Sequence, residues 1–241
     1  MHVFLDKCDK DALRYSKTML LIVGKSCTGK DTFADKYCSI TGCSKVISYT
    51  TRPPRNDAES THIFLSPEEA KSVSYEDKVA FTNIDNYEYF ATKQQIDHNQ
   101  VYIIDPPGMI QLFHHCPNTK FYVLYLYANE DDRAVQARFR GGANSDLEVF
   151  NFYRRNESER LMFDEFEKQV AMDDSKRLRF IKSYPNLMDI LVWRNAYMDG
   201  DFDMLVTRIA GQILGDIRQG FYNDWDEIAE DFKAKLDENK G

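Results

Sequence analysis

One short segment near the N-terminus constrains the fold of this 241-residue chain more strongly than any other. An apolar run at residues 19–23 is followed by a loop that reads Gly24-Lys25-Ser26-Cys27-Thr28-Gly29-Lys30-Asp31-Thr32. Residues 33–37 then have helical character. A strand, a G-x-x-x-x-G-K loop and a helix in this order are typical of a loop whose backbone N–H groups bind phosphate oxygens. The segment therefore predicts an α/β fold with a phosphate site at residues 24–32.

Two residues at the end of this loop indicate how it would bind its ligand. The helix N-terminus adds the positive end of a helix dipole, and the Lys30 ammonium group is expected to contact the outer phosphates. Asp31 occupies the position at which a Ser or Thr hydroxyl normally reaches Mg²⁺. A carboxylate also coordinates Mg²⁺, so we expect nucleotide binding to depend strongly on this metal. The alternative interpretation is a glycine-rich turn that only begins a helix.

The rest of the chain alternates short apolar segments with amphipathic ones. Strands are expected at residues 19–23, 45–49, 101–105, 121–128 and 190–194. Strands that alternate with helices form a parallel sheet with helices packed on its faces. We therefore predict the three-layer α/β/α fold of P-loop NTPases, with a parallel core sheet.

An insertion separates the second and third expected strands. Residues 62–65, 79–83 and 88–91 predict short strands, and Ser66-Pro67 predicts the start of a helix between them. These elements predict a small inserted β-subdomain.

Two helices joined by a glycine-rich break are expected after the fourth expected strand. They are expected at residues 131–140 and 146–170, on either side of a Gly-Gly-Ala-Asn break that begins at Gly141. Two more helices are expected at 202–217 and 223–236, and the second has apolar residues at helical spacing. This acidic C-terminal helix most simply packs on the core. The alternative is a contact with a partner or with a second copy of the chain.

A second polar cluster, Ser48-Tyr49-Thr50-Thr51-Arg52-Pro53-Pro54-Arg55, directly follows the second expected strand. Arg52 and Arg55 lie three residues apart, and the prolines restrict the backbone between them. Two guanidinium groups held in this way suit a phosphate, and the Ser48 hydroxyl is a further donor. The alternative is a solvated basic turn. One strand after a glycine loop, the cluster predicts a site for a second, phosphate-bearing substrate.

Composition argues against several classes of protein. The chain has 31 Lys and Arg against 39 Asp and Glu, and its net charge of −8 argues against binding to long nucleic acids. Its apolar runs are shorter than the roughly 20 residues of a membrane-spanning helix, and its first residues contain no apolar signal segment. Five cysteines without a C-x-x-C pair indicate reduced thiols and no zinc site. We expect a cytoplasmic protein that does not bind membranes.

In their order along the chain, these motifs resemble those of guanylate kinase and related nucleoside monophosphate kinases. The segments that match are the loop at 24–32, Ser48 to Arg55, His62-Ile63-Phe64, Tyr89-Phe90-Ala91-Thr92, Ile103-Ile104-Asp105 and Arg140-Gly141. The S-x-T-T-R-P-P-R segment is the most specific of them.

The resemblance covers residues 17–215 and implies a division into parts. These are a core at 17–49, 100–130 and 186–215, an insert at 50–99 that binds the nucleoside monophosphate, and a lid at about 131–170. The acidic amphipathic C-terminal helix at 216–241 lies outside the resemblance.

The resemblance also implies two nucleotide sites. Loop residues 24–32, with Lys30, would bind ATP together with Mg²⁺, and Asp31 and Asp105 would be the metal ligands. The acceptor monophosphate would be bound by Ser48, Arg52, Arg55, His62, Phe90, Thr92 and Asp105. The transferring phosphoryl group would be stabilised by Lys30, Arg52 and the lid arginines Arg138, Arg140, Arg154 and Arg155.

The acceptor site departs from the family pattern. His62 stands where the family usually has a tyrosine that contacts the acceptor phosphate, and Phe90 replaces another tyrosine. The acidic residue that reads guanine has no counterpart in Ala80-Phe81-Thr82-Asn83. We therefore expect ATP-dependent phosphoryl transfer to a nucleoside or deoxynucleoside monophosphate, with GMP and dGMP as the first candidates. Two alternatives stay open: a catalytically inactive binding module, and a P-loop kinase of a non-nucleotide phosphate.

Overall fold

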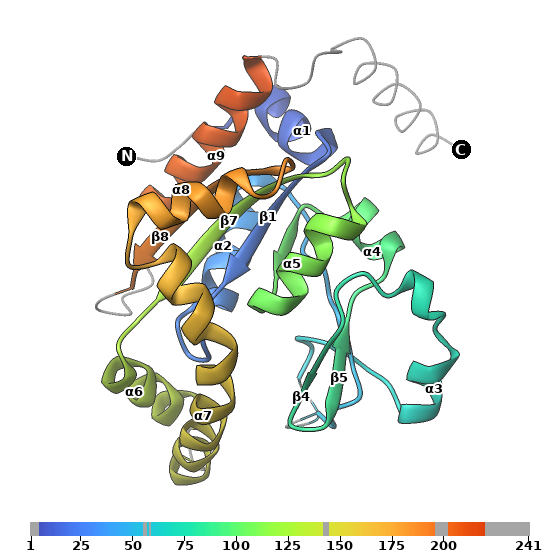
Figure 1. Cartoon of the computed structure of the whole chain (residues 1–241), viewed down its shortest axis with the longest axis vertical. Helices are drawn as coiled ribbons and strands as arrows, with labels where there is room; N and C mark the ends of the chain where they lie inside the picture. The colour runs from blue at the N-terminus through green and yellow to red at the C-terminus, as the bar shows by residue number, and fades with distance from the viewer. Residues whose placement is uncertain (1–4, 55–56, 58, 142–144, 196–201, 220–241) are drawn as a thin grey trace.

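A four-stranded parallel sheet lies at the centre of the computed structural model of the chain (Figure 1). Its strands are β1 (Thr18–Val23), β6 (Val101–Ile103), β7 (Lys120–Tyr127) and β8 (Leu187–Arg194), in the spatial order β6-β1-β7-β8. All six residues of β1 are buried, because a parallel strand covered on both faces needs a continuous apolar run. The structure describes residues 5–54, 57, 59–141, 145–195 and 202–219.

Successive side chains of each strand point to opposite faces of the sheet, and both faces pack against helices. Leu20 and Ile22 join a core with α1 (Lys7–Tyr15), α2 (Lys30–Thr41) and α9 (Asp203–Arg218). Leu21 and Val23 join a core with α5 (Pro106–His115), α7 (Ser145–Val170) and α8 (Asp174–Lys182). These layers confirm the predicted three-layer α/β/α fold with a parallel core sheet.

A second, smaller sheet is formed by the segment between α2 and β6. Its strands are β2 (Tyr49–Thr50), β3 (Ile63–Phe64), β4 (Thr82–Ile84) and β5 (Tyr87–Phe90), in the order β3-β2-β5-β4. The same segment contains α3 (Pro67–Ser72), the 3₁₀ turn η1 (Tyr75–Asp77) and α4 (Lys93–His98). This sheet confirms the predicted inserted subdomain.

Local sequence signals account for the turns of this insert. The β4–β5 hairpin turns at Asp85 and Asn86, whose φ angles of 52° and 66° are the left-handed values of a type I′ turn. Helix α3 begins at Ser66, whose side chain accepts the Glu69 N–H in a capping box, as the Ser-Pro signal predicts.

The prediction of a core-sheet strand at residues 45–49 is wrong, because no strand forms there in the core sheet. Lys45 makes one isolated bridge to Val101, whereas Tyr49 and Thr50 pair with β3 and β5 of the small sheet. The backbone leaves the edge of the core sheet after Val46, whose N–H donates to the Val101 carbonyl over 2.8 Å. The pairing of this segment was therefore decided by hydrogen bonds to β3 and β5, which come later in the sequence.

Helices α1 and α8 were not expected from the sequence. Each buries a single side chain, Leu13 in α1 and Phe180 in α8, so neither has the wide apolar stripe by which a packed helix is predicted. Helix α1 lies on α9, where Asp9 pairs with Arg218 over 2.5 Å.

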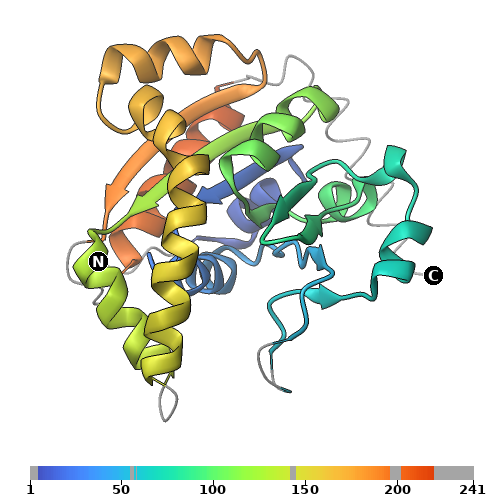
Figure 2. The ribbon, with the colours of Figure 1, turned by 60° about the horizontal axis from the view of Figure 1, so that its bottom comes forward.

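Helices α6 (Glu130–Gly141) and α7 extend beyond the core sheet, at the same end as the small sheet and α3 (Figure 1). Figure 2 shows α6 and α7 on one side of that end and the insert on the other. The helices expected at 131–140 and 146–170 are therefore present, whereas residues 142–144 and the helix expected at 223–236 lie outside the described residues. No helix in the described part of the chain has the length and apolar character needed to cross a membrane.

Candidate functional site

The glycine loop lies where the order of the strands reverses. From β1 the chain passes to β6 on one side of it and then to β7 on its other side. Connections that leave in opposite directions open a crevice at the carboxyl ends of the strands, which is the usual ligand position in an open α/β sheet. Residues 24–29 connect β1 to α2 at this crevice. The predicted phosphate loop is therefore placed where such a sheet binds ligands.

Gly24 and Gly29 meet two different geometric requirements of the loop. A Cβ on Gly24 would lie 2.2 Å from the Leu126 carbonyl oxygen, so only a residue without a side chain approaches β7 this closely. Gly29 caps the start of α2 with a φ of +91°, a left-handed conformation that residues with side chains rarely adopt.

Replacing Gly24 by alanine is expected to destabilise the protein by about 1–3 kcal/mol, because the added Cβ meets backbone rather than a flexible side chain. Gly211→Ala in α9 is the matched control. Nothing lies within 4 Å of its added Cβ, and alanine is favoured over glycine inside a helix by about 1 kcal/mol. Urea denaturation measures both changes, and a Gly24→Ala protein as stable as the wild type would contradict the close approach.

Lys30 begins α2, with its ammonium group inside the loop. Its Nζ donates to the Lys25 carbonyl over 2.7 Å. Burial of this group lowers the pKa of Lys30 below its ordinary value, and the nearby Glu159 carboxylate opposes that shift. The ammonium group is therefore placed to exchange the Lys25 carbonyl for an oxygen of a bound anion.

Two contacts from outside hold the loop in place. Asn195, at the end of β8, is buried and donates its Nδ2 to the Thr28 carbonyl over 3.0 Å. Lys25 Nζ pairs with the Glu167 carboxylate of α7 over 3.0 Å. The loop is thus fixed to the core sheet by one contact and to α7 by the other.

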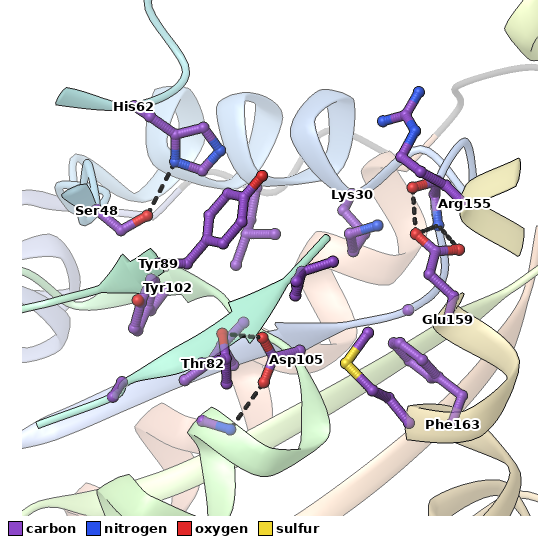
Figure 3. A pocket seen from close by; sticks show the side chains of 18 of the residues that line it. Lys30, Ser48, His62, Thr82, Tyr89, Tyr102, Asp105, Arg155, Glu159 and Phe163 are labelled. Carbon is purple, nitrogen blue, oxygen red and sulfur yellow. Dashed lines mark hydrogen bonds between the residues drawn. The ribbon is translucent and has the colours of Figure 1, made fainter. Parts of the chain in front are cut away.

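A carboxylate of α7 occupies donors of the loop. The two oxygens of Glu159 in α7 accept the Ser26 N–H at 3.0 and 2.9 Å, and the carboxylate also accepts the Ser26 hydroxyl. Figure 3 shows Glu159 on the same side of the cleft as Lys30. The chain itself therefore supplies an anion to the loop.

Arg133 is a buried arginine that joins α6, α7 and the loop. Its Nη1 donates to the Ser26 carbonyl over 3.4 Å, and its Nη2 donates to Asn156 Oδ1 over 2.6 Å. Nη1 also lies 3.8 Å from Glu159 Oε2, and the guanidinium lies 5.2 Å from the centre of the Phe152 ring. Arg133 therefore brings a positive charge from α6 to the loop, in addition to the loop's own Lys25 and Lys30.

The second predicted phosphate site lies across the same cleft (Figure 3). Ser48 Oγ lies 3.0 Å from His62 Nδ1, and both residues line the cleft together with Arg52. The Arg52 guanidinium donates to both carboxylate oxygens of Glu59, over 2.8 and 3.3 Å. Hydroxyl, imidazole and guanidinium groups are donors that suit a phosphate, and here all three residues line the cleft that the glycine loop also lines.

Asp105 follows β6 and caps the start of α5. Its Oδ1 accepts the Gly108 N–H and its Oδ2 accepts the Thr82 hydroxyl, both over 2.8 Å. Burial raises the pKa of this carboxyl, and the two hydrogen bonds oppose the shift. Asp105 also lines the cleft, so one carboxylate both caps a helix and faces the cleft.

Asp105→Ala is expected to lower stability by about 1 kcal/mol through loss of the cap, whereas Asp105→Asn keeps a capping oxygen and has no charge to bury. Because the folded-state pKa is raised, ionised Asp105 costs stability above that pKa. Asp105→Asn should therefore be at least as stable as the wild type at neutral pH, with an advantage that is constant down to the raised pKa and is lost as the pH falls from there to the ordinary carboxyl pKa. Thermal melts over a pH series measure this, and an Asn variant that is less stable than the Ala variant would contradict the cap.

The structure brings many of the predicted site residues into one cleft. Its lining includes Gly24, Ser26, Lys30, Ser48, Arg52, His62, Asp105 and Arg155. Of the four predicted lid arginines, Arg155 is the one in this lining. Arg138 and Arg140 instead form ion pairs with Asp146 and Glu148 of the lid itself, and Arg154 is exposed.

Several residues that were predicted to bind a ligand are not in the lining of this cleft. Phe90 is fully buried and stacks on Tyr49 with ring centres 5.3 Å apart, so it packs inside the small sheet and presents no surface to an acceptor. Thr92 begins α4, where its hydroxyl accepts the Gln95 N–H. Asp31 is exposed in the first turn of α2, and Arg55 lies outside the described residues.

Sequence reasoning missed Arg133, Glu159, Glu167 and Asn195. Glu159 and Glu167 lie in a long helix rich in charges, and no spacing rule separates them from their exposed neighbours. Arg133 did carry a signal, because it is a positive charge close to the start of a helix, where the helix dipole favours negative charge. The residues before it are acidic as that rule expects: Glu130, Asp131 and Asp132. A cation in that place indicates a contact outside its own helix.

The oxygen ligands of the cleft suit a metal ion that binds together with a nucleotide. Among the described residues, no group of three or more His, Cys, Asp and Glu side chains is placed to hold a metal ion. A Mg²⁺ ion bound with a nucleotide needs only one or two carboxylates, because phosphates and water supply its other ligands. Asp105 supplies one carboxylate in the cleft.

Comparison with known proteins adds a distant structural likeness. No family model matches the chain, and no curated protein matches it. A solved structure of guanylate kinase from Anaplasma phagocytophilum is similar at 13% sequence identity and a TM-score of 0.48, over 83% of this chain and 85% of that one. An uncharacterized protein from Eubacterium ventriosum is similar at 11% identity and a TM-score of 0.39, over 79% and 98%. Likenesses at this level establish no family for the chain, and its function has to be inferred from the cleft itself.

Proposed function

We propose that this protein transfers a phosphoryl group from ATP to a nucleoside or deoxynucleoside monophosphate. The observation that carries the proposal is that two sets of hydrogen-bond donors of the kind that suits a phosphate line one cleft. One set is the glycine loop with Lys30, and the other is Ser48, Arg52 and His62. Two phosphate sites in one cleft suit a donor and an acceptor, because phosphoryl transfer needs the attacking and leaving oxygens roughly in line.

In this mechanism the residues of the chain bind the two substrates, orient them and exclude water from the cleft. The loop amides and Lys30 bind the outer phosphates of the donor, and Ser48, Arg52 and His62 bind the phosphate of the acceptor. Arg155 lines the same cleft and adds positive charge for the group in transfer. The reaction needs little covalent chemistry from the protein, so positioning and charge neutralisation supply the rate. Helices α6 and α7 would exclude water and so prevent hydrolysis of ATP.

We further propose that Mg²⁺ accompanies the ATP. Asp105 in the cleft would hold the ion together with phosphate oxygens and water. When bound, the ion neutralises charge on the donor phosphates. Asp31 adds a negative charge at the start of α2, so the loop is expected to bind ATP weakly without a divalent cation.

The wall of the cleft on the insert leaves the choice of acceptor base open to experiment. Ala80, Thr82, Ile84 and Tyr89 line it, and the Thr82 hydroxyl already donates to Asp105. Among the described lining residues of the insert, none is acidic, so the N–H edge of guanine would lack the carboxylate that the motif resemblance associates with it. GMP and dGMP are the first acceptors to test, and the other bases belong in the same series.

The test is an assay of ADP formation with Mg-ATP and each of the common ribo- and deoxyribonucleoside monophosphates in turn. We expect ADP formation that depends on the acceptor and prefers one base. If none of the acceptors changes the rate of ADP formation, the proposal is contradicted, because the second phosphate site would then have no function in turnover.

A second candidate function is binding without turnover. Specific contacts favour it, because donors of both phosphate sites are paired with carboxylates of the chain: Arg52 with Glu59, and Ser26 with Glu159. Nucleotide binding by calorimetry, with no ADP formed from any acceptor, would support this candidate. ADP formation with a phosphorylated sugar and with none of the nucleotides would instead indicate a kinase of a non-nucleotide phosphate.

A further inference from the structure

The contact between Glu159 and the glycine loop is not explained by the proposed function. Its carboxylate accepts the Ser26 N–H at 3.0 and 2.9 Å and also accepts the Ser26 hydroxyl. Backbone N–H groups of a G-x-x-x-x-G-K loop are the donors that bind phosphate oxygens. A carboxylate and a phosphate are both anionic acceptors, so they compete for the same Ser26 donors.

The cations around Glu159 favour a larger anion than a carboxylate. Arg133 Nη1 lies 3.8 Å from Glu159, and the Arg133 side chain is only 4% exposed. The buried Nε–H of Arg133 has no hydrogen-bond partner among the described residues. A buried donor without a partner is uncommon in proteins, and an anion with more oxygens than a carboxylate would supply one.

Neighbouring contacts hold α7 in the position from which Glu159 reaches the loop. Ser158, the preceding residue, donates its hydroxyl to Asp85 in the β4–β5 turn over 3.0 Å. About two helical turns further along, Glu167 pairs with Lys25 of the loop over 3.0 Å. Helix α7 is thus tied to the insert and to the loop, and Glu159 lies between the two ties.

We propose that Glu159 holds the phosphate position of the glycine loop and that a bound nucleotide must displace it. The inference rests on the proposed function, because it takes this loop to be the site of the donor phosphates. The apparent affinity for the donor is then lowered in proportion to the fraction of molecules in which Glu159 occupies the loop. Displacement frees the Ser26 donors and Arg133 for the phosphates and removes one contact of α7, so donor binding is coupled to the position of the lid.

Substitution of Glu159 tests this competition directly. Glu159→Gln keeps the size of the side chain and removes its charge, and Glu159→Ala removes the acceptor altogether. Calorimetry measures the Kd of the full chain for Mg-ATP and for inorganic tripolyphosphate, which carries the phosphates without base or ribose. If Glu159 occupies the loop in about nine-tenths of the molecules, its removal tightens both affinities about tenfold.

Glu157→Gln is the matched control, because it removes the same charge from an exposed side chain of the same helix, where Glu157 pairs with Arg160. Its affinities should equal those of the wild type, and thermal melts show whether each variant folds. Tighter binding by both Glu159 variants, and not by Glu157→Gln, supports the proposal. Unchanged or weaker binding by the Glu159 variants, next to a wild type that binds, overturns it and leaves the proposed function standing. If neither the wild type nor any variant binds ATP or tripolyphosphate, the loop is not a phosphate site, and the proposed function falls with this inference.

Hydrogen exchange supplies a readout that needs no ligand. The amides of α7 and of residues 24–29 should exchange faster in Glu159→Ala than in Glu157→Gln, because only Glu159→Ala removes an acceptor of the loop. Equal exchange in the two variants would overturn the coupling between Glu159 and the lid.

Discussion

Replacing Lys30 by methionine is expected to lower kcat/KM for phosphoryl transfer by about a thousandfold. The Lys30 ammonium group lies in the loop, where its partner is the Lys25 carbonyl, and burial lowers its pKa. Among the described residues that line the cleft, no other lysine could replace it. Methionine has a similar length and is apolar, so the loss falls on charge stabilisation rather than on packing. The measurement is the rate of acceptor-dependent ADP formation over a range of ATP concentrations.

A lysine outside the cleft serves as the control for this substitution. Lys71→Met removes the same charge from an exposed position on α3 and should leave the rate unchanged. Thermal melts should show that Lys30→Met is folded, since burial already disfavours the charged form of Lys30. A folded Lys30→Met protein with more than about a tenth of wild-type activity would remove Lys30 from the mechanism and would support the interpretation of the loop as a helix start alone.

Replacing Arg52 by glutamine is expected to raise the KM for the acceptor about 100-fold, with a smaller effect on the KM for ATP. A guanidinium group that binds a phosphate through two hydrogen bonds contributes on the order of 3 kcal/mol, which corresponds to a factor of this size. Arg52 lies on the insert beside Ser48 and His62, across the cleft from the loop, so the loss should be confined to the acceptor. Initial rates with each substrate varied in turn separate the two KM values.

The comparison variant is Arg160→Gln, which removes an exposed guanidinium group from α7. It should leave both KM values unchanged. Arg52 also pairs with Glu59, so Glu59→Gln is informative as a second variant: loss of that pairing should lower the KM for the acceptor by releasing the guanidinium. An Arg52→Gln protein whose defect lies in ATP binding alone would contradict the assignment of the two phosphate sites.

Local features of this fold could be predicted from the sequence because neighbouring residues specify them. The apolar run at 19–23 forms β1, and the glycine pattern after it forms a tight loop because Gly24 and Gly29 meet steric limits set by the backbone. Ser66 begins α3 through its own hydrogen bond to a residue three positions later. Each of these signals extends over only a few residues, which is why it can be read without knowledge of the tertiary structure.

Pairings between distant segments could not be predicted in this way. Residues 45–49 have the composition of a strand, but the choice between the core sheet and the small sheet depended on hydrogen bonds from Tyr49 and Thr50 to strands later in the chain. Phe90 and Tyr89 are neighbours on β5 and point to opposite faces, so the packing of the sheet decided that Tyr89 lines the cleft and that Phe90 is buried.

By itself, the sequence determined the alternation of strands and helices, the glycine-rich loop between β1 and α2, and the existence of a second cluster of polar and basic residues near Arg52. Only the tertiary structure decided that the two clusters share a cleft and that Glu159 and Arg133 meet the loop. Glu159 lies 133 residues from Ser26, and Arg133 lies 107 residues from it. Contacts at such separations follow from how α6 and α7 pack over the end of the sheet, and they leave no periodic pattern in the chain, because a charged residue on a helix looks the same whether it faces solvent or a phosphate loop.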